Sequence, residues 1–80
     1  MITKDNELKE LLKMPCETMQ DIYYTIALWY NNTKDESIII RYRKCHSLRN
    51  NLNRKVRMWS EMFSIRIEFM PVGYLAVHRL

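Results

Sequence analysis

The feature that most constrains the fold is a change in hydrophobic period near the C-terminus. From residue 48 to residue 63 the apolar side chains recur at helical spacing, whereas Ile65, Ile67 and Phe69 alternate with polar residues. Strict alternation is typical of a half-buried strand. The sequence "MPVG" then has proline at the second and glycine at the fourth position of a type I turn. Because "YLAVHRL" is a suitable returning strand, these residues predict a C-terminal β-hairpin.

Two segments in the first half of the chain carry helical patterns. "NELKELLKM" places its leucines on one side, with Thr3 or Asp5 as a possible cap. Pro15 ends this helix, because the residue before a proline avoids the helical conformation. "CETMQDIYYTIALWYNN", residues 16–32, carries the widest apolar stripe in the chain. It is therefore the predicted central core helix.

The segment "TKDESIIIRYRKC" is open to two interpretations. Thr33 followed by Glu36 fits a capping box, and Ile38, Tyr42 and Cys45 then share one helical face. "SIIIRYR", however, is β-branched and aromatic, which favours a strand. We favour the helix, because the capping signal is positional and propensity is a weak guide. The expected fold is one α+β domain over residues 1–80, with three to four helices followed by the hairpin.

Charge is distributed unevenly along the chain. The net charge of +4 combines an acidic first half with a basic second half. Residues 1–40 contain four Lys and seven Asp or Glu, whereas residues 41–80 contain nine Lys or Arg and two Glu. A basic half-domain is the electrostatic pattern expected for a phosphate-rich partner.

The stretch "LRNNLNRKVRMW" concentrates this charge on one side of a helix that Ser47 is expected to cap. The arc opposite its apolar residues contains Arg49, Asn50, Asn53, Arg54 and Arg57. Arg can form two hydrogen bonds with guanine, and Asn two with adenine. A merely solvated face is the alternative, but it explains the weak helix former Asn and the lack of acids between Glu36 and Glu61 poorly. Flanking phosphate contacts are expected from Arg41, Arg43, Lys44, Lys55 and Arg66.

A basic helix that follows the short turn "KCHS" and precedes a hairpin resembles the winged helix-turn-helix family over residues 33–80. "SLRNNLNRKVRMW" corresponds to the recognition helix and "IRIEFMPVGYLAVHRL" to the wing. The resemblance implies a regulator or accessory factor of transcription whose helix enters the major groove of double-stranded DNA. It also implies a wing tip around residues 71–73, and many helix-turn-helix proteins act as homodimers. The wing candidates are Arg66, His78 and Arg79.

A protein-binding module is the competing function. A compact basic domain could dock on an acidic protein surface, as small phage- or plasmid-encoded inhibitors do. Six methionines and nine aromatic residues suit an adaptable contact surface. The same arginines would then anchor a protein interface, since Arg is enriched at such sites.

Catalysis, metal binding and membrane insertion are not expected. A single glycine cannot build a phosphate-cradling loop, and no third residue is evident to orient His46 beside Cys45. Cys16, Cys45, His46 and His78 match no zinc spacing. We therefore expect no metal, cofactor or small-molecule substrate. The longest apolar run is too short to span a bilayer, and neither a leader nor a disulfide framework is evident, which predicts a cytoplasmic protein with reduced thiols.

Overall fold

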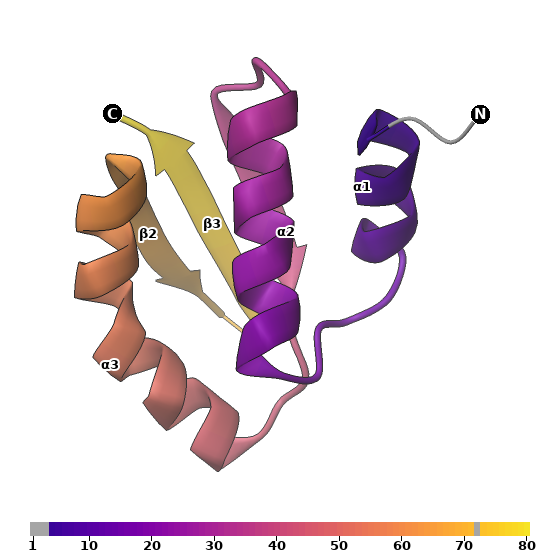
Figure 1. Cartoon of the computed structure of the whole chain (residues 1–80). Helices are drawn as coiled ribbons and strands as arrows, with labels where there is room; N and C mark the ends of the chain where they lie inside the picture. The colour runs from indigo at the N-terminus through magenta and orange to yellow at the C-terminus, as the bar shows by residue number, and fades with distance from the viewer. Residues whose placement is uncertain (1–3, 72) are drawn as a thin grey trace.

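The chain forms three helices and a three-stranded antiparallel sheet in the described residues, 4–71 and 73–80, of a computed structural model (Figure 1). In chain order the elements are α1 (Lys4–Leu12), α2 (Met19–Asn32), β1 (Ser37–Arg41), α3 (His46–Phe63), β2 (Ile65–Met70) and β3 (Tyr74–Arg79). This arrangement confirms the α+β class and the C-terminal hairpin. The third strand, β1, was not the favoured prediction.

The sheet has the order β1-β3-β2. Both outer strands are antiparallel to β3 and hence parallel to each other, so α3 connects two parallel strands separated by the central one. The register aligns Ile38, Val77 and Ile67 in one row that faces the helices. The period of two therefore buries one face of the sheet under α2 and α3 and leaves the other open (Figure 1).

The favoured helix after residue 33 is wrong, because Ser37–Arg41 is a strand with Ile38 and Ile40 buried. Thr33 does not begin a helix. Its backbone N–H and its hydroxyl both donate to the carbonyl of Trp29, so it terminates α2. Pairing of β1 with β3 thus outweighed a local capping signal. As a consequence, β1 lies between α2 and α3, and the two helices are not joined by a short turn.

Helix α2 begins later than predicted, at a capping box formed by Thr18 and Asp21. The Thr18 hydroxyl accepts from the Asp21 N–H, and the Asp21 carboxylate accepts from the Thr18 N–H. Cys16, expected inside the helix, instead donates its N–H to the Arg41 carbonyl. Of the two caps proposed for α1, Asp5 lies within the helix and Thr3 lies outside the described residues.

Arg79 joins the end of the sheet to the end of α2. Alternation along β3 places it on the same face as Val77, beneath the C-terminus of α2. Its Nε donates to the carbonyl of Asp35 at 2.8 Å, and its Nη2 donates to those of Tyr30 at 3.0 Å and Thr33 at 2.7 Å. The guanidinium also lies 4.8 Å from the ring centre of Trp29. Because helix C-termini leave carbonyls without partners, this residue is structural rather than part of a wing.

Helix α3 is the longest helix and follows a loop of extended residues. Its N-cap is Cys45 rather than the expected Ser47, which lies in the first turn. Leu48, Leu52 and Trp59 are buried against the core, as the apolar arc predicts. Ser64 ends the helix in the left-handed conformation, with φ of 55°.

Candidate nucleic-acid interface

The outward face of α3 carries most of the predicted base-contacting residues. Asn50, Asn53, Arg54 and Arg57 are exposed, and so is Lys55 at the edge of the same helix. Arg57 lies 3.6 Å from Glu61, and its side chain is 93% exposed. An ion pair this exposed contributes only about 0.3–0.5 kcal/mol, so Arg57 is readily available to a partner. Up to Ser60, α3 contains no acidic residue.

Arg49 differs from the other residues of this group, because it is half-buried at the edge of α3 that faces the hairpin. Its guanidinium carbon lies 3.4 Å from the ring centre of Phe69, and its Nη1 donates to the Asn53 side-chain oxygen. These two contacts fix the guanidinium plane. The sequence pattern placed Arg49 and Asn53 on one face, but it could not show that one orients the other.

The loop between β1 and α3 brings together three of the predicted phosphate contacts. Arg41, Arg43 and Lys44 line one hollow on the surface together with Pro15, Tyr42 and Tyr74. Arg41 donates from Nη2 to the Lys13 carbonyl at 3.0 Å, and the Arg43 N–H donates to the Cys16 carbonyl at 2.8 Å. These bonds hold the loop against the segment between α1 and α2. The cationic side chains consequently project from a fixed backbone.

Arg66 does not join this group. Alternation along β2 places it on the open face of the sheet, opposite the face that α3 covers. There it pairs with Glu68 at 2.9 Å, and Glu68 also lies 3.6 Å from His78. The three side chains form a small charged cluster on the open sheet face, which is separate from α3.

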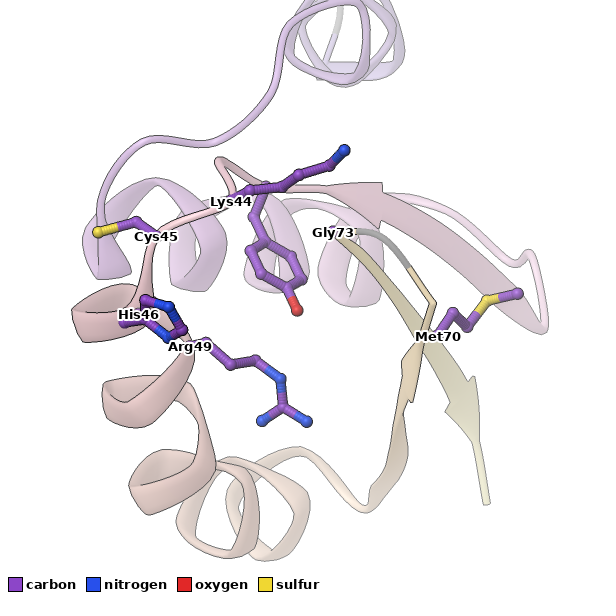
Figure 2. A pocket seen from close by; sticks show the side chains of 7 residues that line it. Lys44, Cys45, His46, Arg49, Met70 and Gly73 are labelled. Carbon is purple, nitrogen blue, oxygen red and sulfur yellow. The ribbon is translucent and has the colours of Figure 1, made fainter.

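A pocket of about 350 Å³ lies where the β1–α3 loop, the first turn of α3 and the hairpin tip meet (Figure 2). Its lining consists of Tyr42, Lys44, Cys45, His46, Arg49, Met70 and Gly73. Sequence reasoning missed this pocket, since it assigned Tyr42 to a helix and considered His46 only as a zinc ligand or as a base beside Cys45. Alternation of Ile38, Ile40 and Tyr42 was the signal that would have placed Tyr42 beside the core.

The two cysteines have opposite environments. Burial raises the pKa of Cys16, which lies under α2 and contacts the Thr25 hydroxyl. Cys45 is exposed, and its pKa is lowered mainly by a hydrogen bond with the Ser47 hydroxyl. Hydrogen bonds from the backbone amides of Leu48 and Ser47 lower this pKa further. Figure 2 shows the Cys45 side chain turned away from Arg49. Across the described residues no three His, Cys, Asp or Glu side chains cluster as metal ligands would.

No family model, curated protein or solved structure matches this chain. Among the helices of residues 4–71 and 73–80, none has the length and apolar character needed to cross a membrane. Function is therefore inferred from the site itself.

Proposed function

We propose that this protein binds double-stranded DNA, as a regulator or accessory factor of transcription, with α3 in the major groove. The observation that carries the proposal is the outward face of α3, which displays Arg and Asn without an acid before Glu61. Arg reads guanine and Asn reads adenine through paired hydrogen bonds. An α-helix of 18 residues with one exposed face has dimensions that the major groove accepts.

Phosphate contacts on either side of the groove come from the β1–α3 loop. Arg43 and Lys44 immediately precede α3, and Arg41 ends β1 beside them. Lys55 lies further along the same helix. The order of α3, β2 and β3 is that of a recognition helix and its wing, which supports a winged-helix-like mode of docking. Because β1 separates α2 from α3, this mode would operate without a short helix-turn-helix. Arg66 has no role in it.

The test is fluorescence anisotropy with a mixed-sequence duplex at about 50 and 200 mM salt. Four phosphate contacts predict a fall in affinity of about 10²-fold between these concentrations. The triple variant Arg49→Ala, Arg54→Ala, Arg57→Ala should bind more weakly at both salt concentrations, because each arginine removed from a base edge costs about 1–3 kcal/mol. The matched control removes three exposed lysines elsewhere: Lys9→Ala, Lys13→Ala, Lys34→Ala. Absence of binding by the wild type at low salt contradicts the proposal, as does an equal loss in the control.

A protein partner with an acidic surface is the second candidate. One observation favours it: Met58 and Met62 are 50% and 55% exposed on the helix that carries the basic face. Exposed methionines beside arginines are typical of adaptable protein contacts. If the duplex is not bound, Met58→Asp combined with Met62→Asp should abolish capture of an acidic partner that the wild type retains, because the new carboxylates replace apolar contacts and repel an acidic surface. A homodimer is a further proposal, and sedimentation of the free and DNA-bound protein measures it directly.

A further inference from the structure

The pocket at the start of α3 is lined by Tyr42, whose hydroxyl is, among the described residues, a free donor at the pocket surface. Tyr42 is only 5% exposed and lines the pocket, and its backbone N–H donates to the Gly73 carbonyl at 2.8 Å. Within residues 4–71 and 73–80 no hydrogen bond reaches the Tyr42 hydroxyl. A phenolic hydroxyl can donate one hydrogen bond. The Tyr42 hydroxyl is therefore available to an acceptor that enters the pocket.

Arg49 supplies an oriented cation at the same pocket. Figure 2 shows its guanidinium directed into the space between α3 and the hairpin. The Arg49 guanidinium lies over the ring of Phe69, and one of its N–H groups donates to the Asn53 side chain. A guanidinium has five N–H donors, so most of them stay available. Since the side chain is already ordered, a ligand does not have to order it on binding.

The remaining lining residues add positive charge and donors but no carboxylate. Lys44 packs its stem beside Gly73, where a Cβ would lie 3.3 Å from the Lys44 Cγ. His46 lies in the first turn of α3, at the positive end of the helix dipole. No Asp or Glu occurs among the described lining residues. Donors from the β1–α3 loop and from α3 match a small anion that accepts hydrogen bonds from several directions.

We propose that this pocket binds a phosphate group, through Arg49, Lys44, His46 and the Tyr42 hydroxyl. The chemistry is shared by inorganic phosphate and by a phosphate of a nucleic-acid backbone. The inference goes beyond DNA binding and does not depend on it, because the pocket residues other than Arg49 and Lys44 were not part of the predicted interface. A free phosphate ligand would make the pocket a site in its own right.

The first experiment titrates inorganic phosphate into ¹⁵N-labelled protein and records two-dimensional NMR spectra, with sodium chloride at matched ionic strength as reference. Saturable shifts are expected at His46, Ser47 and the Arg49 side chain. Arg49→Gln should weaken binding at least about 10-fold, and Tyr42→Phe by about 2- to 10-fold, because each removes a hydrogen bond to a charged ligand. Lys34→Gln, at an exposed position outside both the pocket and the proposed DNA interface, should bind phosphate as the wild type does.

Tyr42→Phe preserves the buried ring, so it keeps the test valid if Arg49→Gln does not fold. Shifts that do not saturate, or that appear equally at all lysines and arginines, overturn the proposal. Unchanged phosphate binding by both pocket variants overturns it as well.

The second experiment separates the two sources of phosphate. A mixed-sequence duplex is titrated with and without saturating inorganic phosphate, again against matched chloride. If the pocket takes a backbone phosphate, inorganic phosphate competes with the duplex and Tyr42→Phe weakens duplex binding. If the pocket takes free phosphate, inorganic phosphate binds while duplex binding, or its absence, is unchanged. Failure of DNA binding therefore leaves the phosphate titration interpretable.

Discussion

Arg79 and Arg49 both lie against aromatic rings, but they use their guanidinium donors in opposite ways. Arg79 directs its donors to backbone carbonyls at the end of α2 and has Trp29 and Tyr30 beside it. Within residues 4–71 and 73–80, Arg49 makes a single side-chain hydrogen bond, to Asn53, and it faces a pocket. The comparison teaches that the number of donors satisfied within the protein separates a structural arginine from one available to a ligand.

Loss of Arg79 should have the largest effect on stability. Arg79→Met leaves carbonyls at the C-terminus of α2 without partners and should lower the free energy of unfolding by about 3 kcal/mol. Urea denaturation followed by fluorescence of Trp29 and Trp59 measures this quantity. Arg57→Met, at an exposed position, should change it by less than about 0.5 kcal/mol. Equal stabilities of the two variants would show that the bonds of Arg79 contribute nothing.

Gly73 tests the other side of the comparison, because it lines the same pocket as Arg49. Gly73 has a φ of 84°, and an added Cβ would lie 3.0 Å from the Tyr42 carbonyl oxygen. Gly73→Ala should therefore cost about 1–2 kcal/mol of unfolding free energy and weaken phosphate binding. Ser64→Gly is the matched control with opposite sign, since Ser64 also has a positive φ and should gain stability. Urea denaturation of both variants measures the two changes in unfolding free energy. A Gly73→Ala protein as stable as wild type contradicts the prediction.

Asn53 sharpens the comparison further, because it orients Arg49 without lining the pocket. Asn53→Ala should weaken binding of inorganic phosphate by about 3-fold while leaving the free energy of unfolding within about 0.5 kcal/mol of wild type. Asn51→Ala removes the same side chain from an exposed position of α3 and is the control. Phosphate binding that is the same in both variants would mean that Arg49 needs no support.

The two cysteines also differ in environment, and here we expect a smaller effect, on the reactivity of the thiols. Cys45 is exposed with a lowered pKa, so its thiolate forms at lower pH than in an ordinary cysteine, whereas Cys16 is buried with a raised pKa. Iodoacetamide should modify Cys45 alone in the native protein and both thiols in urea. Ser47→Ala removes the main cause of the lowered pKa and should move the pH midpoint of Cys45 alkylation upward. A midpoint that does not move refutes the assigned cause.

Local patterns predicted the elements whose partners are close in sequence. The hairpin followed from alternation at Ile65 and Ile67, and α3 followed from the arc between Leu48 and Phe63. The prediction for the segment at Ile38 was wrong because its strand partner, Val77, is distant in sequence. No local signal states that such pairing will outweigh a capping box.

The candidate site likewise contains residues that local patterns placed correctly and residues whose roles depend on distant parts of the chain. Asn50 and Arg54 lie on the exposed face where the helical period placed them. The roles of Arg49 and Arg79 depend on what a neighbouring element presents: Phe69 in one case and the end of α2 in the other. Arg66 was predicted as a wing residue that contacts phosphate, and alternation along β2 places it on the open face of the sheet, opposite α3. The pocket around Tyr42 depends on three elements together, so no single stretch of sequence predicts it.

The most direct test of the proposed DNA interface is an NMR titration of the ¹⁵N-labelled protein with a short mixed-sequence duplex at low salt. Our account predicts that the largest shifts occur at Asn50, Arg54 and Arg57 and at residues 43–44, with little change on the open sheet face around Ile39 and Glu68. Shifts concentrated on that open face, or no shifts at all, would contradict it.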